Sequence, residues 1–214
     1  MLLARHLLAR VWRVGSPAAQ QEVHKNRIAV GAACSALLFG APAVAAVCIG
    51  NCGLSGGTDG VVTGGHRWVS SNGGVGGQGL GLGSETNGST YVTDAFVANG
   101  TDELSLEFNY VTSDGGGYAD YAFFQLLGGA GGPLTLFTAR TTPGGNTVPG
   151  FGMPPIAPGV TLTPAATPII PGGPVWSPLG VWSGRCYAGG CGYTGWIRMT
   201  FTPAAGTYRS ASAW

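Results

Sequence analysis

LSLEFNYVTSDGGGYADYAFFQLL, residues 104–127, is the stretch that decides the fold. Apolar and polar side chains alternate over residues 104–110, which is the two-residue period of a strand with one buried face. TSDGGG (112–117) is typical of a turn, because glycine and aspartate favour tight backbone reversals. DYAFFQLL (120–127) is apolar on both faces, which indicates a central strand. The stretch therefore predicts two strands joined by a glycine-rich turn.

The rest of the chain repeats this pattern of short strands and loops. Residues 141–185 hold ten prolines and predict a long surface loop, and no helical period follows residue 47. Short strands separated by glycine and proline favour an all-β fold, a β-sandwich or a jelly-roll-like domain with long loops. Further strands are expected at residues 66–70, 89–98, 134–140 and 193–202.

Composition supports an ordered, loop-rich β-protein. The chain of 214 residues has 40 glycines and 14 prolines, yet 44% of its residues are hydrophobic and 10% are aromatic. Disordered chains lack that apolar content. From residue 47 onward there are five arginines, no lysine and eight carboxylates, a net charge of −3. This part of the chain has no basic patch, which argues against a nucleic-acid partner.

The N-terminal region has the pattern of an export signal. In HKNRIAVGAACSALLFGAPAVAAV (24–47), a basic flank precedes an apolar run and small residues suited to cleavage near Ala46. A transmembrane helix over 28–47 is the alternative, but Pro42 and the alanine-rich end favour cleavage. We therefore expect a leader and signal at 1–46 and a single domain at 47–214, secreted and without a membrane span. Residues 1–22 precede an already complete signal and are interpreted as a mis-called start.

Four cysteines remain after that cleavage, in the two local pairs CIGNC (48–52) and CYAGGC (186–191). An even number of cysteines in an exported chain predicts disulfides, and the simplest connectivity joins Cys48 to Cys52 and Cys186 to Cys191. A zinc site that uses both pairs is the alternative, although zinc motifs usually have tighter spacings.

Catalytic motifs in the sequence are weak. GLSGG (53–57) matches a serine nucleophile motif, with His66 as its only available histidine, but it lacks the strand-to-helix context. GVGGQG (74–79) matches a nucleotide-binding pattern at a frequency that chance explains. No spacing selects a pair of carboxylates for glycoside hydrolysis, so we expect no enzyme. The candidates for such a pair are Glu85, Asp94, Glu103, Glu107, Asp114 and Asp120.

Two kinds of binding residue stand out. Asp114 and Asp120 flank a glycine turn and are candidate ligands for Ca²⁺, which prefers oxygen donors. No other cofactor is expected. Aromatic residues in or near loops are candidates for stacking on sugar rings, because flat and rigid side chains suit that contact. These residues are Trp176, Trp182, Tyr187, Tyr193 and Trp196.

Several blocks, taken in order, resemble a family of uncharacterised exported bacterial proteins that often carry a C-terminal PEP-CTERM sorting signal. The resemblance implies a secreted, β-sandwich-like domain in a Gram-negative bacterium that produces exopolysaccharide, and it brings no catalytic residues. The blocks are ETNGSTYVTDAF (85–96), LEFNYVTSDGGGYADYAFFQLL (106–127), LFTARTTPGGNTVPGFGMP (136–154), PIIPGGPVWSPLG (168–180) and CYAGGCGYTGW (186–196).

The chain departs from this family after GTYR (206–209), where it reads SASAW, without Pro-Glu-Pro, an apolar helix or a basic cluster. Codons for the residues after Arg209 can encode an alternating strand in another frame. We therefore expect a frameshift near Arg209 that removes the last strands and the anchor.

These observations lead to one expected function and two alternatives. The expected function is that of a non-enzymatic protein of the cell surface or extracellular matrix, with extracellular polysaccharide as its candidate partner. The alternatives are a secreted carbohydrate-active hydrolase and a purely structural matrix protein.

Overall fold

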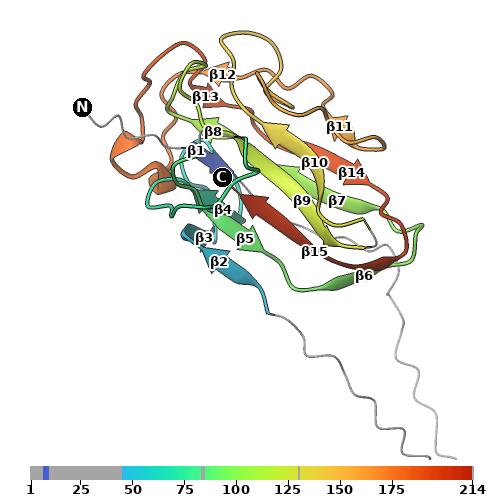
Figure 1. The fold of residues 1–214 in the computed structure, drawn as a ribbon. Coiled ribbons are helices and arrows are strands. Elements are labelled where there is room, and N and C mark those ends of the chain that lie inside the picture. The colour runs from blue at the N-terminus through green and yellow to red at the C-terminus, as the bar shows by residue number, and fades with distance from the viewer. Residues whose placement is uncertain (1–6, 10–44, 83–84, 130, 214) are drawn as a thin grey trace, which may run out of the picture.

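The computed structural model describes residues 7–9, 45–82, 85–129 and 131–213, which form an all-β sandwich (Figure 1). Its elements are β1 (Leu7–Ala9), β2 (Val47–Ile49), β3 (Asn51–Ser55), β4 (His66–Ser70), β5 (Thr90–Val92), β6 (Phe96–Ala98), β7 (Leu104–Phe108), β8 (Val111–Thr112), β9 (Ala122–Gly128), β10 (Leu134–Ala139), β11 (Thr161–Thr163), β12 (Ile170–Pro171), the 3₁₀ helix η1 (Ser177–Trp182), β13 (Gly192–Tyr193), β14 (Ile197–Phe201) and β15 (Gly206–Ala213).

One layer is an antiparallel sheet with the strand order β10-β9-β15-β5-β2, and β6 also pairs with β15. The long strands β9 and β15 lie side by side at its centre (Figure 1). This position explains the two apolar faces of residues 120–127. The prediction of a central strand there is confirmed by β9.

The second layer is made of two sheets that the chain joins end to end. β11-β14-β7 forms one of them, and β12-β13-β8-β1-β4-β3 forms the other. β7 runs into β8 through Tyr110, and β13 runs into β14 through Thr194. The Thr194 N–H donates to the Tyr110 carbonyl at 2.9 Å, and the Tyr110 N–H donates to the Thr194 hydroxyl at 3.0 Å. These two bonds hold the junction between the sheets together.

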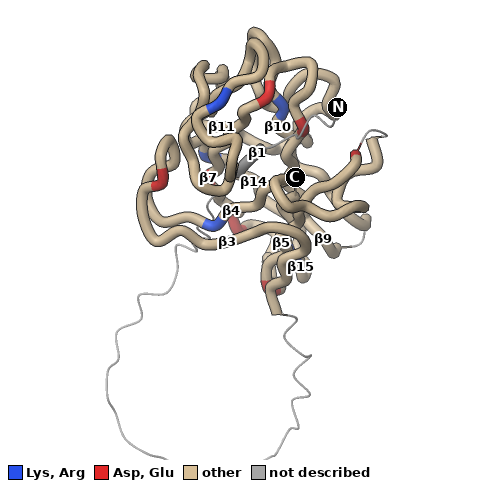
Figure 2. Tube along the Cα trace, turned by 90° about the vertical axis from the view of Figure 1, so that its left-hand side faces the viewer, with Lys and Arg blue, Asp and Glu red and all other residues tan. Residues whose placement is uncertain are grey.

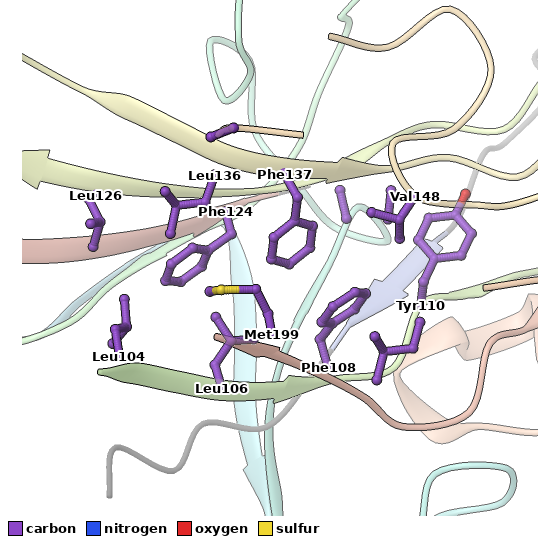
Figure 3. Packing of buried hydrophobic residues seen from close by; sticks show 14 of the residues in the cluster. Leu104, Leu106, Phe108, Tyr110, Phe124, Leu126, Leu136, Phe137, Val148 and Met199 are labelled. Carbon is purple, nitrogen blue, oxygen red and sulfur yellow. The ribbon is translucent and has the colours of Figure 1, made fainter. Parts of the chain in front are cut away.

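The main core lies between the two layers. In Figure 3, side chains of β9 and β10 face those of β7 and β14. Phe137 stacks on Phe108 with ring centroids 4.4 Å apart, and Phe124 lies 6.0 Å from Phe137. All three rings are at most 1% exposed. Truncation of one such ring costs about 3–5 kcal/mol, so this stack is a principal source of stability.

A smaller cluster lies under η1. Trp176 is fully buried against Leu179, Val62 and Val111. Its indole N–H donates to Nε2 of buried His66 at 3.3 Å, and Nδ1 of that histidine lies 2.8 Å from the Gly64 carbonyl. The ring is therefore held as the tautomer with a proton on Nδ1. This cluster anchors the proline-rich segment to β4 and β8.

Most predicted strands are present. The alternation over residues 104–110 is confirmed by β7, where buried and half-buried residues alternate. The strands predicted at 66–70 and 134–140 correspond to β4 and β10. The long loop predicted over 141–185 is confirmed in part, because it also contains β11, β12 and η1.

Two predicted strands are each divided in two. The one at 89–98 becomes β5 and β6, because three residues from Thr93 onward stand opposite two residues of β15, although the Thr93 N–H still donates to the Ser210 carbonyl at 2.9 Å. The Thr93 carbonyl accepts from Arg209 Nε at 2.8 Å, and its hydroxyl accepts from the Ser210 N–H at 3.0 Å. The one at 193–202 becomes β13 and β14.

Residues Arg209–Ala213 lie within β15 and pair with β9. The frameshift near Arg209 stays a prediction about the gene. In the structure, the given residues after Arg209 form part of β15. The export signal and its cleavage site lie almost wholly outside the described residues, of which only β1 and Ala45–Ala46 fall within 1–46. Within the described part of the chain, no helix is long and apolar enough to cross a membrane.

Candidate functional site

A polar cleft of about 330 Å³ opens at the end of the sandwich where the glycine-rich turn after β8 meets the loop before β5. Its size falls in the range of small-molecule sites, which are usually a few hundred Å³ or more. The side chains that line it are mostly hydrogen-bonding groups. They come from Gln78, Leu82, Glu85, Thr86, Asn87, Tyr118, Ala119, Asp120, Tyr121, Arg140 and Met153, with Gly117 and Gly152.

Glu85 and Tyr121 form one wall of the cleft. The Tyr121 hydroxyl donates to the Glu85 carboxylate, which also accepts the Leu82 N–H at 2.6 Å. The Leu80 N–H donates to the same hydroxyl at 2.8 Å. Burial, followed by the hydrogen bond to Glu85, raises the pKa of Tyr121 above its ordinary value. The phenol therefore stays protonated and keeps Glu85 in place.

Asp120 and Arg140 continue the wall of the cleft, and Asp120 directly precedes Tyr121 in the chain. Arg140 Nε donates to the Ala119 carbonyl at 2.8 Å, and its Nη1 donates to the Phe151 carbonyl at 3.3 Å. These bonds join the turn after β8 to the loop after β10. The cleft thus presents two carboxylates and one guanidinium, a set that accepts and donates hydrogen bonds in several directions.

The CYAGGC stretch supports this wall. Cys186 and Cys191 are disulfide-bonded, which confirms the predicted pairing, as does the bond between Cys48 and Cys52. We call residues 186–191 the stapled loop and residues 113–121 the wall loop. The Tyr187 N–H donates to the Ser113 carbonyl at 3.0 Å, and the Gly116 N–H donates to the Gly189 carbonyl at 2.9 Å. The disulfide therefore fixes a loop on which the cleft wall rests.

The two loops fit closely at one glycine. A Cβ added to Gly115 would overlap both the backbone and the side chain of Ala188. A Cβ added to Gly189, on the stapled loop, would meet nothing within 4 Å. Glycine at position 115 is therefore required by the approach of the stapled loop.

The stapled loop contributes Tyr187 to a small aromatic surface. Tyr187 is 41% exposed and meets half-buried Trp182 edge to face, with centroids 5.2 Å apart. The guanidinium of Arg185 lies 5.7 Å from the centre of the Trp182 ring. We call Trp182, Arg185 and Tyr187 the aromatic platform. The aromatic platform includes a residue of the stapled loop, and the cleft is lined in part by the wall loop, which rests on the stapled loop.

The aromatic residues predicted to stack on sugar rings have different exposures. The prediction for Trp176 is wrong, because its side chain is fully buried in the cluster under η1. Tyr193 and Trp196 are half-buried against the same cluster, and the Trp196 N–H bonds to Thr63. Of the five predicted residues, Trp182 and Tyr187 are the two that belong to the aromatic platform.

The two candidate calcium ligands both lie near Tyr110. Asp114 and Asp120 are both close enough to this tyrosine to help raise its pKa, although burial is the larger cause. Asp114 is 5% exposed, and its N–H bonds to the Thr112 hydroxyl at 3.0 Å. Among the described residues, no group of three or more His, Cys, Asp or Glu side chains gathers into a metal site. A Ca²⁺ ion here would need backbone carbonyl oxygens as further ligands.

The structure separates the other catalytic candidates. Ser55 and His66 are cross-strand partners, but the Ser55 hydroxyl donates to the Gly57 carbonyl and the His66 ring bonds Gly64 and Trp176. A Ser-His hydrogen bond is therefore not formed. Glu107 pairs with Arg198 at 3.0 Å on the surface. Of the six candidate carboxylates, Glu85 and Asp120 are brought into one cleft.

Sequence reasoning missed most residues of the cleft, among them Tyr118, Tyr121 and Arg140. Tyr121 lies just before a strand and Arg140 just after one, which are positions where side chains often reach a shared edge. No family model, no curated protein and no solved structure matches the chain.

Proposed function

We propose that the chain is an exported, non-enzymatic protein of the bacterial cell surface or extracellular matrix that binds neutral polysaccharide. The observation that carries this proposal is the polar cleft, whose wall loop rests on the stapled loop that carries Tyr187 of the aromatic platform. Two disulfides on small loops support export, because such bonds persist mainly outside the cytoplasm. We place the protein with the PEP-CTERM-associated family of Gram-negative bacteria on the resemblance of its sequence blocks.

The lining of the cleft suits a sugar unit. Vicinal hydroxyls donate well to carboxylates such as Glu85 and Asp120, and they accept from Arg140 and from the amide of Asn87. Tyr118 also lines the cleft and is 56% exposed, so its ring can cover an apolar sugar face. Two carboxylates against one guanidinium favour a neutral sugar over a uronate.

The aromatic platform offers a second contact for a long chain. Tyr187 lies on the stapled loop, and Trp182 ends η1 and packs against the cluster under it, so little conformational entropy is lost on binding. Weak contacts at two places on one polymer raise the overall affinity through effective concentration. The sparse, scattered charges in Figure 2 agree with an uncharged ligand.

Retention on columns of immobilised neutral polysaccharides tests the proposal. Tyr118→Ala and Glu85→Gln should each reduce retention about tenfold, and Tyr187→Ala should reduce it by a smaller factor. Val97→Ala is the matched control, because this side chain is 76% exposed on β6, away from both contacts. If the unaltered protein is not retained on any neutral polysaccharide, or if the cleft variants behave like V97A, the proposal is wrong.

A hydrolase is the second candidate, because Glu85 and Asp120 share one cleft. Incubation of the protein with the retained polysaccharide should give reducing ends under this alternative. Glu85→Gln and Asp120→Asn would then each abolish product formation while binding persists. A purely structural matrix protein would show neither retention nor products.

A further inference from the structure

A second pocket, of about 410 Å³, lies between the paired strands β3 and β4 and the start of η1. It shares no lining residue with the polar cleft, and its residues all belong to the domain at 47–214. We call it the Trp68 pocket. The residues that line it are Asn51, Leu54, Ser55, Asp59, Trp68, Asn72, Ser177 and Pro178.

The indole of Trp68 is held in place on the pocket side of the strand pair. Gly53 stands opposite Trp68 across the pair, and a Cβ added to Gly53 would overlap the indole. The glycine therefore lets the ring lie directly over β3. Trp176 meets the same ring edge to face, with centroids 6.4 Å apart. Trp68 is half-buried, so part of a fixed aromatic ring stays open to the pocket.

Two amide side chains and the indole supply uncharged hydrogen-bonding groups. Asn51 Nδ2 donates to the Asn72 carbonyl, and Asn72 Nδ2 donates to the Pro178 carbonyl at 3.4 Å. Only the nitrogen of an amide side chain can donate to a carbonyl, so the oxygen of each amide is left as an acceptor. No residue in the described part of the chain accepts the Trp68 indole N–H. The pocket thus offers acceptors and a donor to a ligand.

Asp59 is the one charged residue that lines this pocket among the described residues. The Ser177 hydroxyl donates to its Oδ1 at 2.8 Å, and the Ser177 N–H donates to its Oδ2 at 3.2 Å. A carboxylate oxygen has two acceptor sites, so Oδ2 can take a further hydroxyl donor. A lone carboxylate without a cationic neighbour in the lining repels anionic ligands. The pocket therefore suits an uncharged ligand that is rich in hydroxyl groups.

One loop carries residues of both the Trp68 pocket and the polar cleft. This loop joins β4 to β5, and it contributes Asn72 to the pocket and Asn87 to the cleft. Asn87 Nδ2 donates to the carbonyl of Ser71, the residue before Asn72, at 3.4 Å. The two sites are therefore neighbours on the surface.

We propose that the Trp68 pocket is a second sugar-binding subsite, an inference that rests on the proposed function for its ligand class. One unit of a neutral polysaccharide stacks on the Trp68 indole, and its hydroxyls bond the amide oxygens of Asn51 and Asn72 and the carboxylate of Asp59. Because one loop lines both sites, a single polymer can contact both. Two weak contacts on one polymer raise the overall affinity.

The Trp68 indole N–H gives a direct readout in two-dimensional NMR of isotopically labelled protein. Its cross-peak is identified by its loss in Trp68→Phe. A hexasaccharide of a neutral glucan, galactan or mannan should shift this cross-peak in a saturable manner. The Trp196 cross-peak should stay in place, because that N–H already bonds Thr63. An unchanged Trp68 cross-peak with all these hexasaccharides, or a shift with an oligomer of a uronic acid alone, overturns the proposal.

Two tryptophan variants give a matched comparison of affinity. Trp68→Phe keeps an aromatic ring but removes the indole N–H, and it should weaken hexasaccharide binding about fivefold. Trp196→Phe is the control, because Trp196 packs against the same cluster and does not line the pocket. It should leave the affinity unchanged within about twofold. Near-ultraviolet circular dichroism checks that both variants fold, and equal affinities of the two folded variants overturn the proposal.

The cleft variants separate this inference from the proposed function. If Trp68 responds while Tyr118→Ala and Glu85→Gln are retained like Val97→Ala, the pocket is a sugar site and the proposal for the cleft fails. If those cleft variants lose retention while the Trp68 cross-peak stays silent, the cleft proposal stands and the second subsite is wrong.

Discussion

The Tyr110 hydroxyl donates to the Asp120 carbonyl, 3.1 Å away, beneath the wall of the polar cleft. The same hydroxyl accepts the N–H of Thr141 at 3.0 Å. Tyr110 is fully buried, so one phenol ties the wall loop to the end of β10 from inside the core. The shape of the cleft therefore depends on a buried residue that does not line it.

Tyr110→Phe should destabilise the protein by about 1–3 kcal/mol near pH 8, because two buried backbone groups lose their partner. Urea unfolding measures this difference, and Tyr118→Phe, which removes an exposed hydroxyl, is the control. A loss equal to that of the control would show that the two bonds do not contribute.

The same variant should change the response to alkali. Burial raises the pKa of folded Tyr110, so its stabilising effect is complete below about pH 10, where an unfolded tyrosine ionises, and is lost as the pH rises further. Between pH 9 and pH 11, the free energy of unfolding should fall by about 1.4 kcal/mol less in Tyr110→Phe than in the unaltered protein. The figure follows because pH 11 lies about one unit above the pKa of an unfolded tyrosine. Equal falls in both proteins would contradict the raised pKa.

Removal of the two disulfides should have separable effects. Cys186→Ser with Cys191→Ser, and Cys48→Ser with Cys52→Ser, should each cost about 2 kcal/mol, since both bonds close short loops. Only the first pair should also weaken polysaccharide retention, because the stapled loop carries the wall loop. Thermal unfolding of both double variants tests the loss of stability, and column retention of both tests the loss of binding. Equal loss of retention in the two would point to a general effect on folding.

Gly115→Ala should destabilise the domain by about 1–3 kcal/mol, because the added methyl group overlaps Ala188. Gly189→Ala adds the same group to the opposing loop in open space and should be neutral within about 0.5 kcal/mol. Denaturant midpoints compare the two variants. If G189A is the more damaging, the loops do not meet as described.

Calcium binding at Asp114 and Asp120 should raise the melting temperature at millimolar Ca²⁺ but not at millimolar Mg²⁺, since Mg²⁺ demands a stricter octahedral site. Asp114→Asn and Asp120→Asn should each abolish the rise. Asp102→Asn is the control, because this exposed carboxylate accepts bonds from Asn99 in a turn. A melting temperature that does not respond to Ca²⁺ in the unaltered protein rejects the site.

The strands that sequence periodicity predicts are those whose burial alternates. β7 is the clearest case, because its polar residues face outward along its whole length. β15 lacks that signal, since its last residues are Ser and Ala, which are buried on both faces between β9 and β5. Backbone pairing alone defines that part of the strand, and small residues carry no periodic hydrophobic pattern.

The cleft could not be predicted from the sequence either, and the reason is different. Glu85 and Asp120 are far apart in the sequence, and only the packing of the loop before β5 against the wall loop brings them together. The local disulfides were predictable because each pair is close in sequence. Exposure of the aromatic residues was not, since Trp176 and Tyr187 lie in equally glycine-rich and proline-rich surroundings.

The central place of β15 has a consequence for biosynthesis. Its partners β5, β6 and β9 all precede it in the chain, and none of the three is paired with another of them. A ribosome or a secretion channel that delivers the chain from its amino end must release residues 206–213 before these strands can join. This sheet is therefore completed late, after β9 and β10 can already have paired with each other.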